Sequence, residues 1–201
     1  MTALPFEHVS TLSLKAVVPG ALWRRPTSSD PERALRWARQ AHGSQRYGQR
    51  SYVCHLTDVV RATLRMGWSS RDALVAAALH DVVEDTDVTI EQVRERFGCE
   101  VAGAVDALTR RPGQVMDAYF EGMGVLALGV KLADRVCNLR NLGRCGSAQL
   151  ERDRTRRIVK YAAEMPALRR RIDAFTDAKL HAALDVVERE LLGAQVRLAA
   201  L

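Results

Sequence analysis

Apolar residues recur at intervals of three and four along most of the chain, which is the spacing of amphipathic helices, and alternating strand patterns are almost absent. Capping residues, glycines and prolines mark where these helices begin and end. The pattern predicts helices over about residues 31–42, 56–66, 71–85, 89–98, 101–108, 115–122, 126–142, 147–165 and 174–197, with a short one near 169–171 after Pro166. The sequence therefore predicts an all-α fold that forms a single domain.

Breaking residues divide the chain into three expected parts. Residues 1–29 contain several prolines and are expected to form an irregular N-terminal extension. Pro31 follows Asp30 as the first residue of a helix, so the main domain is expected over residues 30–175. Residues 176–201 are expected to form a C-terminal helix that packs on this domain or extends from it.

Length and composition are those of an independently folding domain. The chain has 201 residues, of which 47% are hydrophobic, and this is enough for a core. Its 30 basic and 24 acidic residues give a net charge of +6, which is compatible with phosphorylated ligands. The Arg-rich stretch 152–171 contains one aromatic residue, Tyr161, and not a series of interleaved ones, so we interpret it as a solvated helix face and do not expect a nucleic-acid partner.

The cysteines and the N-terminus bear on the compartment. No pair of cysteines has the CxxC spacing, and none has the Cys-His spacing of a zinc module. The first 18 residues contain Glu7, His8 and Lys15, so they resemble neither a signal peptide nor a membrane span. We expect a reduced, cytoplasmic protein without a membrane partner. The four cysteines are Cys54, Cys99, Cys137 and Cys145.

The run ALHDVVEDT at residues 78–86 carries the first candidate chemistry. If residues 78–85 are helical, Glu84 lies one turn from His80, and Asp85 lies one turn from Asp81. Residues 73–79, directly before His80, are all apolar, so this helix is expected to be buried. The polar side chains at its end therefore need partners to offset their desolvation. A divalent cation satisfies them together, so the run predicts a metal-and-water site.

A second run, VKLADRVCNL at residues 130–139, repeats this arrangement. Asp134 and Asn138 lie one helical turn apart, so a carboxylate that binds metal would have an amide beside it. His55 opens a predicted helix and is a further ligand candidate.

Six segments share their order and approximate spacing with a known family: Ala41-His42, Tyr52 to His55, Ala77 to Thr86, Phe97 to Val101, Leu108-Thr109 and Val130 to Leu139. On these residues the chain resembles the HD-domain phosphohydrolases, and among them the RelA/SpoT-like hydrolases of the alarmones guanosine tetra- and pentaphosphate. The resemblance extends from about residue 31 to 145 and implies an HD-domain helical bundle. The length leaves no room for a synthetase domain, so a free-standing small alarmone hydrolase is expected.

The resemblance implies that His55, His80, Asp81 and Asp134 hold one divalent metal. Two imidazoles and two carboxylates leave positions for water and a phosphate oxygen, which suits a six-coordinate ion better than tetrahedral zinc. Manganese is therefore the expected ion.

The resemblance also implies the reaction and the residues that act in it. Glu84 and Asp85 are expected to orient the attacking water and move its proton. The water, activated by the metal, attacks the 3′-diphosphate and releases pyrophosphate and GDP or GTP. Lys131 and Asn138 are expected to bind the nucleotide.

The expected substrate loop differs from the family pattern. Relatives read Gln-x-Arg and then Gly-x-Pro-Tyr-Ile-x-His-Pro, whereas residues 45–56 read QRYGQRSYVCHL, without either proline. Arg46 is the expected stand-in for the family's basic residue. This departure motivates an alternative, an HD phosphohydrolase of another nucleotide such as NADPH or a nucleoside monophosphate. A non-catalytic nucleotide- or RNA-binding HD module is a further alternative, and a homo-oligomer is compatible with the sequence.

Overall fold

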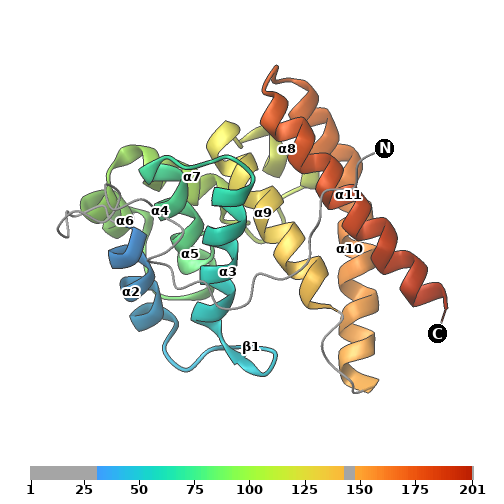
Figure 1. Cartoon of the computed structure of the whole chain (residues 1–201). Coiled ribbons are helices and arrows are strands. Elements are labelled where there is room, and N and C mark those ends of the chain that lie inside the picture. The colour runs from blue at the N-terminus through green and yellow to red at the C-terminus, as the bar shows by residue number, and fades with distance from the viewer. Residues whose placement is uncertain (1–30, 143–147, 201) are drawn as a thin grey trace.

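The computed structural model describes residues 31–142 and 148–200, which form a layered bundle of helices (Figure 1). The predicted extension over residues 1–29 lies outside the described residues, as do Ser147 and Cys145. The elements are α2 (Pro31–His42), β1 (Arg46–Tyr47), β2 (Arg50–Ser51), α3 (Tyr52–Arg65), α4 (Arg71–Leu79), α5 (Val82–Asp85), α6 (Ile90–Phe97), α7 (Cys99–Leu108), α8 (Met116–Glu121), α9 (Val125–Asn141), α10 (Ala148–Asp173) and α11 (Ala178–Ala199). The all-α prediction is confirmed, because the two strands, each of two residues, form only a small antiparallel hairpin.

Helices α4 and α9 form the centre of the bundle. All residues of α4 from Ala73 to Leu79 are buried, and so is nearly every residue of α9 from Ala127 to Leu139. Helix α9 packs against α3, α4, α7 and α11, which explains why it is apolar on most sides. Gly129 permits one of these contacts, because a Cβ atom there would lie 2.6 Å from Cε2 of Trp68.

The predicted caps are present at two helix starts. The Ser70 hydroxyl accepts a hydrogen bond from the Ala73 amide at 3.3 Å at the start of α4. Thr89 and Gln92 form the expected capping box of α6, in which each side chain bonds to the backbone amide of the other residue. These bonds satisfy amides that the helices themselves leave unpaired.

Two helix predictions are wrong. The helix expected through residue 85 ends at Leu79, and α5 begins at Val82 after a turn in which Asp81 has φ −109° and ψ 0°. In contrast, α10 continues through Pro166, which was expected to divide it. Pro166 is exposed, so water can satisfy the carbonyl that loses its helical partner, while buried residues on both sides of it keep α10 on the bundle.

The C-terminal helix α11 packs against α9 and α10. The described residues share one hydrophobic core, to which α11 contributes Leu180, Leu184 and Val187. No described helix combines the length and the apolarity needed to cross a membrane. The boundaries expected between the three parts of the chain stay predictions.

Candidate active site

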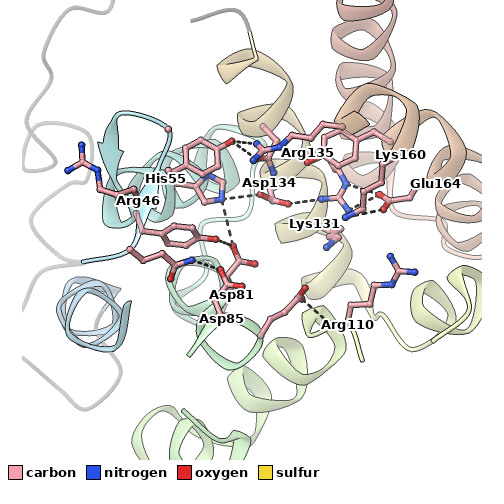
Figure 2. A pocket seen from close by; sticks show the side chains of 18 of the residues that line it. Arg46, His55, Asp81, Asp85, Arg110, Lys131, Asp134, Arg135, Lys160 and Glu164 are labelled. Atoms are coloured by element: carbon pink, nitrogen blue, oxygen red, sulfur yellow. Dashed lines mark hydrogen bonds and ion pairs between the residues drawn. The ribbon is translucent and has the colours of Figure 1, made fainter. Parts of the chain in front are cut away.

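Three elements bring the four predicted metal ligands together. His55 lies in the first turn of α3, His80 and Asp81 form the turn between α4 and α5, and Asp134 lies in the middle of α9. In Figure 2 the side chains of His55, Asp81 and Asp134 point toward one another. Successive residues of a helix point in directions about 100° apart, so the turn at residues 80 and 81 allows both side chains to reach one place.

The distances are those of a ligand cluster. His80 Nε2 lies 2.9 Å from Asp81 Oδ2, and His55 Nε2 lies 3.2 Å from Asp134 Oδ1. The two crossed distances, His55 Nε2 to Asp81 Oδ2 and His80 Nε2 to Asp134 Oδ1, are 3.8 and 3.7 Å. Ligand atoms at right angles around an ion with bonds of about 2.1 Å lie about 3 Å apart. His55, His80 and Asp134 have ligand atoms that all lie within 4.8 Å of one another, whereas Asp81 lies beside the two histidines but outside this group of three.

The hydrogen bonds around the cluster leave ligand atoms available. His80 Nδ1 lies 2.9 Å from the carbonyl oxygen of Ala77, so Nδ1 carries a proton and Nε2 is the ring nitrogen that faces the cluster. His80 Nε2 is buried, with the carboxylates of Asp81 and Asp134 at 2.9 and 3.7 Å, but it makes no hydrogen bond of regular geometry. The Tyr52 hydroxyl donates to Asp81 Oδ2 at 2.5 Å and holds that carboxylate in place.

The electrostatics of the cluster also fit a cation. Burial alone would raise the pKa of Asp134, but hydrogen bonds from His55 and His80 and the charges of His80 and Arg135 hold it well below its ordinary value. Burial would likewise lower the pKa of His80, and the neighbouring Asp81 and Asp134 instead raise it to about 10. The two carboxylates therefore attract a positive charge between them. Among the described residues, His55, His80 and Asp134 form a cluster that could hold a metal ion.

A buried charge network lies directly behind Asp134. Arg135 Nη1 donates to Asp134 Oδ2 at 2.8 Å, and its Nε and Nη2 donate to Glu164 Oε2 at 3.0 and 2.7 Å. The Arg135 guanidinium also stacks over the ring of Tyr161, 4.4 Å from its centroid. Glu164 and Tyr161 come from α10, so this helix reaches the cluster from outside the segments that suggested the site.

The cluster opens into a cavity of about 400 Å³ whose lining is rich in charged groups (Figure 2). The basic side chains that line it come from the hairpin, the loop before α8, and helices α9 and α10. Five carboxylates also line the cavity, so its own positive excess is small and would grow with a bound divalent ion, which would favour polyanionic ligands. The basic residues are Arg46, Arg110, Lys131, Arg135, Arg157 and Lys160.

Glu84 and Asp85, predicted to handle the proton, both line this cavity and are exposed. Glu84 Oε2 accepts a hydrogen bond from the Arg110 backbone amide at 3.0 Å, and Asp85 Oδ2 accepts one from Gln45 Nε2 at 2.9 Å. Each carboxylate is thus held at the cavity by a hydrogen bond from a loop, Glu84 from the loop before α8 and Asp85 from the loop before β1.

Two of the three predicted substrate residues lie beside the cluster. Asn138 Nδ2 donates to Asp134 Oδ1 at 2.6 Å, so the amide predicted next to the metal is in contact with its ligand. Lys131 lies over the ring of Tyr119, with Nζ 5.1 Å from the centroid, and burial together with the Arg135 charge lowers its pKa to about 8.

Arg46 is placed differently. Its guanidinium donates to the Gln49 carbonyl within the hairpin, and Figure 2 shows it pointing away from Asp81 and Asp134. The structure therefore does not bring this group to the cluster. The next residue, Tyr47, lies there instead, with its ring stacked on His55 at 4.4 Å between centroids.

Comparisons with known proteins show which family the chain belongs to. Residues 34–113 match the HD-domain family. The chain is 31% identical over 159 residues to guanosine-3′,5′-bis(diphosphate) 3′-pyrophosphohydrolase MESH1 of Danio rerio, a match that covers 73% of this chain and 87% of that protein. It is 36% identical to the Mus musculus protein of the same name, over 57% of this chain and 68% of that protein. The chain belongs to the MESH1-type family of HD-domain proteins.

Two further comparisons bear on this family membership. A solved structure described as a metazoan ortholog of SpoT that hydrolyses ppGpp aligns with a TM-score of 0.65 and 29% identity, over 83% of this chain and 97% of that chain. The guanosine-3′,5′-bis(diphosphate) 3′-pyrophosphohydrolase of Haemophilus influenzae is 37% identical over 145 residues, but the chain spans only 20% of its length. HD domains bind a divalent metal, and the clustered histidines and aspartate of this MESH1-type chain could hold one.

Some site residues of this MESH1-type protein had no clear signal in the sequence. Arg157 and Lys160 belong to the stretch interpreted as a solvated face, and both are exposed, but they also line the cavity. Their spacing of three residues puts them on one side of α10. Glu164 was not predicted because an isolated Glu in a charged helix has no distinguishing pattern, and Tyr47 because it lies in the altered loop.

Proposed function

We propose that this protein hydrolyses the 3′-diphosphate of guanosine tetra- or pentaphosphate and releases pyrophosphate and GDP or GTP. The observation that carries this proposal is the cluster of His55, His80, Asp81 and Asp134 at the base of a cation-lined cavity. Relatives that share this fold carry the corresponding activity in their names. The acidic pair Glu84 and Asp85 beside the cluster distinguishes a hydrolase from a module that only binds a nucleotide.

The four clustered side chains would hold a divalent ion, and we infer that it is Mn²⁺. Nitrogen and oxygen donors in equal number suit this ion, and the buried His80 Nε2, which faces two carboxylates without a hydrogen bond of regular geometry, supports a bound cation. When bound, such an ion supplies Lewis-acid stabilisation of the phosphoryl group and lowers the pKa of water. The carbonyl of Ala77 and the hydroxyl of Tyr52 orient the ligands.

The acidic pair would receive and move the proton of the attacking water. Glu84 and Asp85 are exposed at the cavity, so their carboxylates stay accessible to a water beside the cluster. Arg110 and Gln45 each donate one hydrogen bond to this pair and restrict its rotamers. Such positioned acid–base groups contribute a factor of about 10² to 10⁴ to the rate.

The cations of the cavity would bind the two diphosphates of the substrate. Lys131 and Arg110 line the cavity with the acidic pair, and Arg157 and Lys160 line it from α10. The phosphate oxygens of the substrate carry several negative charges that repel one another, and these basic groups would stabilise that negative charge in the transition state. Asn138, in contact with Asp134, is placed to bind the nucleotide next to the reacting phosphate.

A cytoplasmic location is part of this proposal. It is supported by the cysteines, because Cys54, Cys99 and Cys137 are free thiols among the described residues and free thiols are compatible with a reducing compartment. Its partner is a small phosphorylated nucleotide, and a homo-oligomer stays a prediction.

The proposal is tested with purified, Mn²⁺-loaded protein and guanosine tetraphosphate. We expect equal amounts of pyrophosphate and GDP, and loss of both products in the His80→Ala variant. The same assay includes NADPH and nucleoside monophosphates. Cleavage of one of these without any pyrophosphate release from guanosine tetraphosphate would reject the proposed substrate.

A further inference from the structure

A buried chain of charges joins the metal centre to α10. Arg135 donates to Asp134 through Nη1 and to Glu164 through both Nε and Nη2 (Figure 2). Only 5% of Arg135 and 2% of Glu164 is exposed. Exposed ion pairs contribute little, whereas breaking a buried pair leaves an uncompensated charge. These contacts are therefore among the strongest constraints near the site.

The two oxygens of Asp134 have different partners. Oδ1 accepts a hydrogen bond from Asn138 Nδ2 at 2.6 Å. It also lies 3.2 Å from His55 Nε2 and 3.7 Å from His80 Nε2, so it faces the ligand cluster. Oδ2 faces away from it and accepts the hydrogen bond from Arg135 at 2.8 Å. Since a carboxylate is planar, holding one oxygen fixes the direction of the other. Arg135 thereby directs Oδ1 at the ion.

Glu164 in turn fixes Arg135. It accepts two of the guanidinium hydrogen bonds, while Tyr161 covers one face of the group at 4.4 Å. The second oxygen of Glu164 lies 3.9 Å from Nζ of Lys160, on a side chain that is 51% exposed. Without the Glu164 charge, the Arg135 cation would be balanced mainly by Asp134 and would compete with the metal for that carboxylate.

We propose that Glu164 is a positioning residue of the metal centre that acts through Arg135 on Asp134. The inference rests on the proposed metal site. It makes α10 part of that site, although α10 lies beyond the residues 34–113 that match the HD-domain family.

The test measures the affinity of the full chain for Mn²⁺ by competition with a chelating dye. Loss of an outer contact of this kind weakens metal binding about 10- to 100-fold, and we expect this result for Glu164→Gln. The matched control is Glu190→Gln, which alters another α9 pair, Arg140 Nε to Glu190 Oε1 at 2.7 Å, at the exposed surface. The Glu190→Gln control should bind Mn²⁺ with the affinity of the wild type. An affinity of Glu164→Gln for Mn²⁺ equal to that of the wild type overturns the inference.

A double-mutant cycle separates positioning from a general structural effect. If Glu164 acts through Arg135, Glu164→Gln added to Arg135→Met causes no further loss of Mn²⁺ affinity, whereas independent effects would add. If Glu164→Gln does not fold, Glu164→Asp replaces it, because the shorter side chain keeps the charge but loses the reach. Its affinity must also fall.

The His80→Ala variant distinguishes failure of the inference from failure of the site. If His80→Ala loses Mn²⁺ binding while both Glu164 variants keep it, only the positioning role is rejected. If His80→Ala binds Mn²⁺ like the wild type, the proposed metal site itself is wrong.

Discussion

Replacing the acidic pair by amides in the double variant Glu84→Gln, Asp85→Asn should abolish most activity without harming the fold. Both side chains are exposed, and each accepts one hydrogen bond, at 3.0 Å from the Arg110 amide and 2.9 Å from Gln45. An amide retains one acceptor oxygen of similar shape, so the free energy of unfolding should change by no more than about 0.5 kcal/mol. Neither residue is one of the four ligands, so Mn²⁺ affinity should stay close to that of the wild type.

The rate should respond very differently. Loss of proton transfer costs a factor of about 10² to 10⁴, which corresponds to about 3 to 5 kcal/mol in the activation free energy. The assay is pyrophosphate release at saturating Mn²⁺ and substrate, with kcat and KM determined separately. A matched control, Asp87→Asn with Glu95→Gln, changes two exposed acidic residues that do not line the cavity. A kcat within threefold of the control, or a loss explained by weaker Mn²⁺ binding, would refute the assigned role.

Three further predictions concern stability. Gly129→Ala should lower the free energy of unfolding by about 1 to 3 kcal/mol, because its Cβ would lie 2.6 Å from Trp68 Cε2. Gly103→Ala, whose Cβ would have nothing within 4 Å, should instead be neutral or stabilising. Equal urea midpoints for the two variants would contradict this prediction. Burial lowers the folded-state pKa of Lys131 to about 8, so the unfolded chain binds the ammonium proton of this lysine more tightly than the folded chain does. Lys131→Met should therefore stabilise the protein at pH 7 by at most about 3 kcal/mol. This stabilisation should decrease as the pH rises from 8 toward 10.5. A stabilisation by Lys131→Met that increases with pH would contradict this prediction. Finally, Mn²⁺ at 100 times its dissociation constant should add about 2.7 kcal/mol, and a Tm shift that persists in His80→Ala would place the ion elsewhere.

The helical periodicity of the sequence was sufficient to predict most of the fold. The caps at Ser70 and Thr89 each involve residues three positions apart, and local patterns of that kind can be predicted from the sequence. The end of α4 at Leu79 could not be predicted, because the apolar run before it consists of good helix-forming residues and contains no signal that ends a helix. The turn arises from a tertiary requirement, since His80 and Asp81 reach the same place because the helix is interrupted at these two residues, between Leu79 and Val82.

The same division applies to the site. The ligands lie in motifs whose joint occurrence was informative, so their candidate roles could be assigned from the sequence and their convergence is seen in the structure. The substrate side was less accessible, because Arg46 turns into its own hairpin and Tyr47 lies against His55. Glu164 contacts Arg135 across 29 positions in the sequence, and such a pairing depends on how α10 packs, which no local pattern of charges determines.

The most direct test of the metal site is anomalous diffraction from crystals of the full chain soaked with Mn²⁺. The account predicts one strong peak at about 2.0 to 2.3 Å from His55 Nε2, His80 Nε2, Asp81 Oδ2 and Asp134 Oδ1. A peak bound by other side chains, or no peak in crystals that diffract well and contain Mn²⁺ in the solvent, would contradict it.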